Sequence, residues 1–88
     1  MVVITARHMA GGVLHEHIAA VRWLDPATSA TGTSSREQMV TWLDKGGQAS
    51  VRDGVHEIAV GVVRAVPSYI RTYADGVWTD NLLALPTY

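Results

Sequence analysis

The 88-residue sequence contains no cysteine and no phenylalanine, and Lys45 is its sole lysine. The absence of cysteine excludes disulfide bonds and four-cysteine zinc sites. A chain this short therefore depends on good core packing, or on a partner that covers apolar surface. The other basic residues are all arginines, and alanine, valine and glycine are abundant. This composition is typical of a GC-rich genome and fits an actinobacterial or actinobacteriophage source.

The sequence also lacks an excess of charge of either sign, and it lacks long apolar runs. Seven Lys and Arg balance eight Asp and Glu, for a formal net charge of −1. This balance gives no long-range attraction to nucleic acid or to an anionic membrane. No apolar run reaches the length of a membrane-spanning helix, and the N-terminus lacks the residue order of a signal peptide. We therefore expect no membrane partner, and a location in a host cytoplasm or in a virion.

Hydrophobic residues make up 48% of the sequence, which is enough for one folded domain over residues 1–88. Apolar alternation and β-branched residues indicate strands, bounded by turn dipeptides such as Asp53-Gly54 and Asp75-Gly76. The predicted strands are Val2–Met9, Leu14–Leu24, Ala49–Arg52, Val55–Ala65, Tyr69–Tyr73 and a brief Val77–Thr79.

The small, polar residues 27–35 are predicted to form a mobile loop. Ser34 and Glu37 then have the spacing of a capping box, which predicts a helix that runs to about Lys45 and stops at Gly46-Gly47. Asp80 is expected to cap a final turn. Together these elements predict a single α+β domain in which one helix packs on a face of an antiparallel sheet of about five strands, in the order β-β-α-β-β-β.

Histidines are the residues most able to bind a metal. His15 and His17 lie two apart, so on a strand they would share a face, and His8 lies across the proposed hairpin. These three are weak candidates, because a polar strand end explains them equally well and no fourth ligand is evident. His56 and Glu57 would face opposite ways on a strand and cannot act as one acid–base pair.

No known nucleotide-binding loop, nucleophile motif or zinc-finger spacing occurs in the sequence. We assign no catalytic residue and no cofactor, and we expect a protein that is not an enzyme. Arg71 has candidate partners in Asp75 and Asp80 across the final hairpin. Both acids also suit local duties, in a turn and in a cap.

Three tryptophans in so short a chain point either to a core that uses Trp in place of Phe or to an interaction surface. Tyr69, Arg71 and Tyr73 share one face of a predicted strand. That face resembles a stacking platform for single-stranded nucleic acid, although the neutral charge argues against it. The candidate interface residues are Trp23, Trp42, Trp78, Tyr69, Arg71 and Tyr73.

The C-terminal residues Tyr69-Ile70-Arg71-Thr72, Asp75-Gly76, Asp80-Asn81-Leu82-Leu83 and Leu85-Pro86 form the most distinctive pattern in the chain. This pattern resembles the C-terminal motif of a small domain-of-unknown-function family of bacteria and bacteriophages. The resemblance covers nearly the whole chain. It implies a phage or prophage source and transfers no catalytic or binding residue.

Three functional hypotheses follow. The first is a non-enzymatic protein-interaction or structural module, phage-encoded, that self-associates or decorates a capsid or another assembly. The alternative is an accessory or regulatory protein that binds single-stranded nucleic acid or a nucleotide. The third, a metal-dependent enzyme built on His8, His15 and His17, has the least support.

Overall fold

The computed structural model of the chain describes residues 1–52 and 54–88. Within these residues the backbone forms one mixed sheet of seven strands, in the order β3-β2-β1-β4-β5-β6-β7. The helical segments are the 3-10 turn η1 (His15–His17) and helix α1 (Arg36–Asp44). The strands are β1 (Val2–Met9), β2 (Ile18–Asp25), β3 (Ala30–Ser35), β4 (Ala49–Asp53), β5 (His56–Val63), β6 (Tyr69–Ala74) and β7 (Val77–Thr79).

The prediction of an antiparallel sheet of about five strands in the order β-β-α-β-β-β was wrong. The sheet is mixed, because β1 pairs with β4 in parallel, with Val2 opposite Ala49 and Val3 opposite Ser50. A parallel pair needs a long connection. Here that connection contains η1, β2, β3 and α1. The sheet has seven strands rather than about five, and β3 is the strand that was not predicted.

The largest local error concerns residues 27–35, which were predicted to be a mobile loop. Residues 30–35 form β3, an edge strand that pairs with β2 from Ala20 opposite Ser35 to Asp25 opposite Ala30. Its small polar residues give no apolar alternation, so the pairing is set by β2 rather than by β3 itself. Gly32 stands opposite Trp23, and its lack of a side chain leaves room for the indole ring.

The second predicted strand also begins later than expected. Residues 15–17 form η1, and the strand runs from Ile18 to Asp25. Because a 3-10 turn advances about 120° per residue, residues two apart no longer share a face. The strand geometry assumed for His15 and His17 was therefore wrong.

Helix α1 begins one residue later than the predicted capping box. Ser35 is the N-cap: its Oγ accepts from the Gln38 N–H at 3.2 Å, and Gln38 Oε1 accepts from the Ser35 N–H at 2.8 Å. The predicted stop is confirmed, since Gly46 has a left-handed φ of 94°. The N-cap and the C-terminal stop of α1 each depend on residues only a few positions apart. The sequence therefore predicts both ends of the helix to within one residue.

The C-terminal hairpin follows its prediction closely. Strand β7 occupies Val77–Thr79, and Asp75 and Gly76 have φ values of 53° and 82°, as a tight hairpin turn requires. The predicted Asp53-Gly54 turn includes Asp53, which lies outside the described residues. Gly54 has a φ of 61°.

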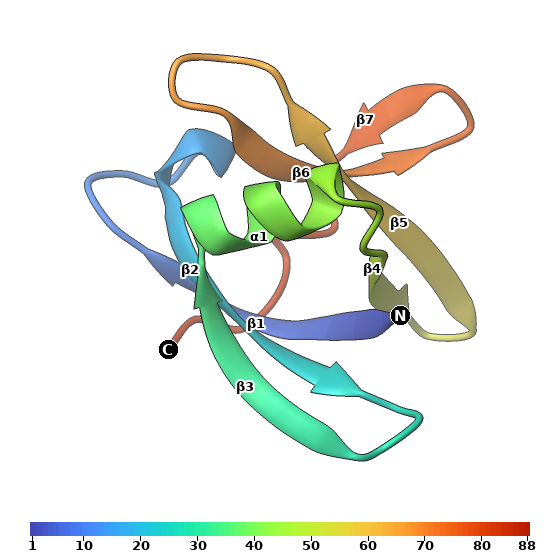
Figure 1. Ribbon diagram of the computed structural model, residues 1–88. Coiled ribbons are helices and arrows are strands. Elements are labelled where there is room, and N and C mark those ends of the chain that lie inside the picture. The colour runs from blue at the N-terminus through green and yellow to red at the C-terminus, as the bar shows by residue number, and fades with distance from the viewer.

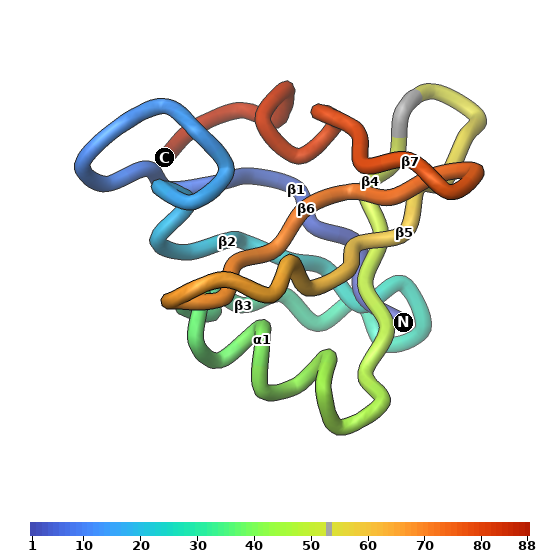
Figure 2. Tube along the Cα trace, turned by 90° about the horizontal axis from the view of Figure 1, so that it is seen from above, coloured from blue at the N-terminus to red at the C-terminus, as the bar shows by residue number. Residues whose placement is uncertain are grey.

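The sheet curves around α1, which contacts β2 and β3 in one half and β5 and β6 in the other (Figure 1). Residues 80–88 lie on the opposite side of the sheet from α1 (Figure 2). They bring a fully buried Leu82 into the core, and Thr87 pairs with Arg7 of β1. The core cluster consists of Ile4, Ile18, Val21, Met39, Ala49, Val51, Val60, Ile70 and Leu82.

Candidate functional site

Two of the predicted interface residues, Trp23 and Trp42, line one cavity of about 330 Å³ between α1 and the β2–β3 hairpin. We call this cavity the tryptophan slot. Its lining comes from β1, β2, β3 and α1, so it exists only in the folded chain. The lining residues are Val2, Trp23, Asp25, Ser34, Gln38, Met39 and Trp42.

Trp23 is held in place on the sheet side of the slot. Its ring lies over Gly32, where an added Cβ would come within 2.6 Å of the indole. Its Nε1–H donates to Ser34 Oγ at 3.0 Å. The ring therefore has a fixed position, and its one polar group is already hydrogen-bonded, so only an apolar face remains for a ligand.

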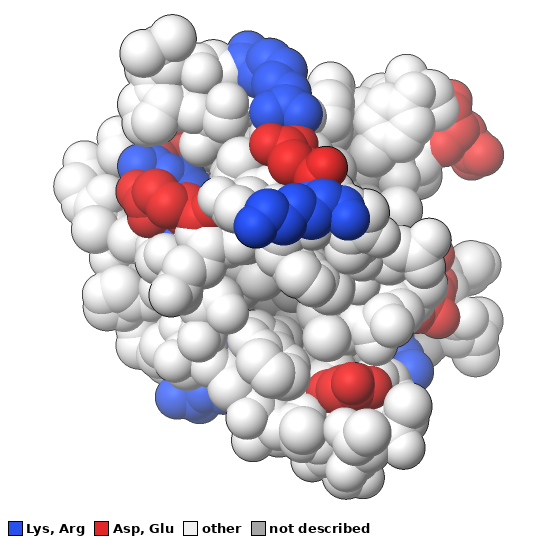
Figure 3. Space-filling model, in the orientation of Figure 1, with Lys and Arg blue, Asp and Glu red and all other residues white. Residues whose placement is uncertain are grey.

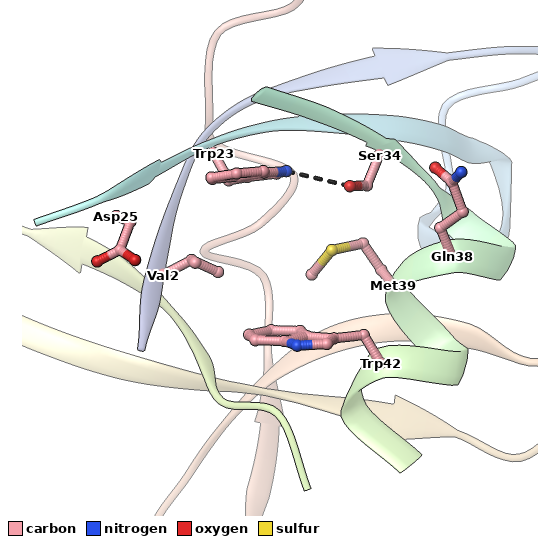
Figure 4. A pocket seen from close by; sticks show the side chains of 7 residues that line it. All are labelled: Val2, Trp23, Asp25, Ser34, Gln38, Met39 and Trp42. Atoms are coloured by element: carbon pink, nitrogen blue, oxygen red, sulfur yellow. Dashed lines mark hydrogen bonds between the residues drawn. The ribbon is translucent and has the colours of Figure 1, made fainter. Parts of the chain in front are cut away.

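Trp42 forms the facing wall from the last turns of α1. Its ring lies over Gly47, whose N–H donates to the Trp42 carbonyl at 3.0 Å just after the helix end. The side chain is nevertheless 38% exposed. Met39, which belongs to the core, and Val2 lie between the two indoles (Figure 4).

The two ends of the slot are polar. Figure 4 places the Asp25 carboxylate at one end, beside Val2, and Gln38 at the other. Asp25 Oδ1 accepts from the Ala27 N–H at 3.0 Å, a bond that closes the turn between β2 and β3. The slot thus combines aromatic and aliphatic walls with a carboxylate of fixed position.

The remaining predicted interface residues lie elsewhere, on β6 and β7. Trp78 covers Gly61 of β5 and meets the Tyr73 ring edge-on, with 5.1 Å between the ring centroids. Tyr69 stands opposite Val63. The six candidates therefore belong to two separate surfaces, and only Trp23 and Trp42 line the slot. The interface role of each residue stays a prediction.

Arg71 is tied to the C-terminal hairpin. Its Nε–H donates to the Thr79 carbonyl at 3.1 Å, and its Nη2 lies 2.8 Å from Asp80 Oδ1. Of the two partners expected from sequence, Asp80 is the one it pairs with. The Asp80 carboxylate forms the ion pair with Arg71, and its expected role as a cap of the following turn stays a prediction. The positive charge that the nucleic-acid hypothesis needs on this face is thus already paired.

His15 is the one buried histidine among the described residues, with 8% of its surface exposed. Its Nε2 lies 3.8 Å from Asp80 Oδ1 and has no hydrogen-bond partner within the described chain. Burial lowers the pKa of His15, and the nearby Arg71 and Arg7 lower it further, while Asp80 opposes them. The environment of His15 therefore favours the neutral imidazole over the charged form.

The three histidines considered for a metal lie in different settings. His8 Nδ1 contacts the backbone oxygen of Tyr88, and the His17 ring packs over Gly12. His15 is buried beside Asp80. Among the residues that the structure describes, no group of three or more His, Asp or Glu side chains is placed to hold a metal ion. The candidate metal site required His15 and His17 to share one face of a strand, and they do not lie on a strand.

The buried neutral histidine predicts a pH dependence of stability. Well above pH 6.5 the imidazole is mostly neutral in both the folded and the unfolded chain. As the pH falls below 6.5, the unfolded chain takes up the proton first, so the free energy of unfolding declines until the lower folded pKa is passed. Urea unfolding at about pH 7.5 and about pH 5.5 measures this decline.

The decline in the free energy of unfolding between about pH 7.5 and about pH 5.5 should be smaller in the His15→Gln variant. His56→Gln removes an exposed histidine and should keep the wild-type decline. The lowered pKa values of Glu37 and Asp44 place their titration below this window. An unchanged decline in His15→Gln would show that His15 is not its source.

Sequence reasoning missed most of the slot. The sequence assigned no site role to Asp25 or Met39. Val2, Ser34 and Gln38 carried no site signal at all. The one available clue was Gly32, since a lone glycine among small residues marks a place where a large ring can approach the backbone.

The surface around the slot carries charges of both signs. Figure 3, which views the face with α1 at its front, shows acidic and basic side chains interspersed in a largely uncharged surface. Neither helical segment in the described residues is long and apolar enough to cross a membrane.

Comparison with known proteins identifies a family. A family model described as a protein of unknown function (DUF3892) matches residues 3–86. Neither the curated proteins nor the solved structures contain a match to the chain. Because the family model covers almost all of the 88 residues, the chain belongs to the DUF3892 family of proteins of unknown function.

Proposed function

We propose that this protein is a non-enzymatic protein-interaction module, and that the tryptophan slot holds a side chain of its partner. The observation that carries the proposal is the pair of indoles on opposite sides of one open cavity. Tryptophan is enriched among the residues that dominate binding energy at protein interfaces, where it fills or lines desolvated pockets. A slot whose walls are already positioned needs little reorganisation to bind.

The size of the slot favours a single side chain over a larger ligand. Its volume of about 330 Å³ lies at the low end of small-molecule sites, which span roughly 300–1,000 Å³. Covering the exposed part of Trp42 and the other apolar walls would contribute about 25 cal/mol for each Å² removed from water. A partner that inserts one side chain and lays its backbone across Gln38 would gain this contribution.

Site-specific cross-linking identifies the partner and tests the proposal. A photoreactive residue placed at Gln38, on the rim, should capture a partner polypeptide, whereas one placed at Asp75, on the distant hairpin, should not. The affinity of the purified partner is then measured for two variants. Trp42→Ala should weaken binding by about tenfold or more. Trp78→Ala should change it by less than about twofold.

Trp78 is a matched control because its exposed fraction, 38%, equals that of Trp42. Thermal unfolding of both variants separates a loss of binding from a loss of fold. Gln38→Lys, a rim residue outside the core whose replacement also removes the Ser35–Gln38 cap bond, serves as a second slot variant, with its thermal unfolding measured as well. Equal affinities for wild type and both slot variants would contradict the proposal. A homodimer that Trp42→Ala dissociates would support the slot as the interaction site, with a second copy of the chain as the partner.

The phage source and the virion role stay predictions from the resemblance of the C-terminal motif. Placement of the gene beside capsid and tail genes would support a virion role, and placement among early genes would support a regulator. The nucleic-acid alternative stays a prediction as well. Failure to bind single-stranded DNA or RNA at low salt would remove it.

A further inference from the structure

The charge of the tryptophan slot identifies the kind of side chain that it would accept. Of the lining residues that the structure describes, Asp25 alone carries a charge. Its Oδ1 accepts one hydrogen bond, from Ala27, and no other described residue bonds its carboxylate or forms an ion pair with it. A carboxylate has about four acceptor positions, so Asp25 keeps most of its capacity for a ligand.

The walls of the slot reinforce this negative character. The face of an indole ring carries the negative part of its quadrupole and attracts cations within about 6 Å. The Trp23 N–H is already bonded to Ser34, so this wall presents its face and no donor. Gln38 uses its Oε1 in the helix cap, which leaves its amide N–H groups for a backbone carbonyl of the partner.

Other ligand classes fit less well. An anionic group would meet the Asp25 carboxylate, and the Trp23 N–H is not available to bind it. A purely apolar side chain would cover Asp25 without giving it a partner, which costs free energy. A cation that is also planar and apolar on its faces can pair with the carboxylate and lie against an indole wall of the slot.

We propose that the occupant is an arginine side chain of the partner polypeptide, with its guanidinium against an indole wall of the slot and donating to Asp25. A guanidinium stacks on aromatic faces and matches a carboxylate with two parallel N–H donors. A lysine ammonium has the charge without the planar shape, so it should bind more weakly. This inference rests on the proposed function of the slot, because it specifies which side chain the slot holds.

The test uses Nα-acetyl-arginine amide and its uncharged isostere, Nα-acetyl-citrulline amide, with the indole N–H signals of the protein as the readout. The arginine compound should shift the Trp23 and Trp42 signals and bind about tenfold more tightly than the citrulline compound. Asp25→Asn should remove most of this preference. The asparagine side-chain oxygen can still accept from Ala27, so the turn and the fold should persist.

Equal binding of the two compounds, an arginine preference that survives Asp25→Asn, or no binding of the arginine compound would each overturn the inference. These outcomes are distinct from failure of the proposed function. If Trp42→Ala still abolishes binding of the cross-linked partner, the slot remains the interaction site and only the identity of its occupant changes. If Trp42→Ala leaves partner binding intact, the proposed function itself fails.

Discussion

Replacing Leu82 by alanine is expected to lower the free energy of unfolding by about 3 kcal/mol, the usual cost of truncating a buried leucine. Leu82 is fully buried, although the turn that contains it belongs to no helix or strand. It packs in the same cluster as Ile70 and Val51. Removing its isopropyl group leaves a cavity between the sheet and the C-terminal segment. Urea unfolding measures the loss directly.

Val55→Ala is the matched control for this truncation. Val55 is 96% exposed, so losing its methyl groups should change the free energy of unfolding by no more than about 0.5 kcal/mol. If Leu82→Ala were as mild as Val55→Ala, residues 80–88 would be an appendage and not part of the core. A domain of this size has a total stability of roughly 5–15 kcal/mol, so the expected loss is a large fraction of it.

Replacing Gly47 by alanine is expected to cost about 1–3 kcal/mol, the range for overpacking a filled site. An added Cβ at Gly47 would overlap the Trp42 ring and lie within 2.8 Å of its Cε3. The backbone at Gly47 gives the alanine no other difficulty, since its φ lies outside the left-handed range. Relief requires the Trp42 ring to swing toward solvent, which removes one wall of the slot.

The loss of stability and the loss of the slot should therefore appear together in Gly47→Ala. Gln48→Ala alters the neighbouring exposed residue and should leave both properties near their wild-type values. Chemical unfolding gives the first quantity, and the indole N–H signal of Trp42 reports the second. An unshifted Trp42 signal in a variant of wild-type stability would mean that the ring does not rest on Gly47.

Sequence reasoning succeeded where a structure is set by adjacent residues. The cap of α1, predicted to within one residue, its stop at Gly46 and the hairpin at Asp75-Gly76 each depend on a few neighbouring side chains or on one positive φ. The pairing of Arg71 with Asp80 follows from the same hairpin, because the tight turn brings β6 and the end of β7 together. Such features can be predicted from spacing alone.

Sequence reasoning failed where residues far apart in the chain determine the structure. Residues 30–35 have no apolar pattern and become a strand because β2 offers them a free edge. The parallel pairing of β1 with β4 joins segments separated by more than 40 residues and leaves no local signature. The slot likewise depends on residues that are far apart in the sequence. Trp23 and Trp42 are each visible as aromatics, but only the curvature of the sheet around α1 makes them face one cavity.

The most direct test of the slot as the interaction site is the response of the three tryptophan indole N–H signals to the cross-linked partner segment. The chain has three tryptophans, at positions 23, 42 and 78, so each signal reports one place on the fold. Binding in the slot predicts that the Trp23 and Trp42 signals shift and that the Trp78 signal stays. A shift of the Trp78 signal alone would contradict this account and place the interaction on the β6–β7 hairpin.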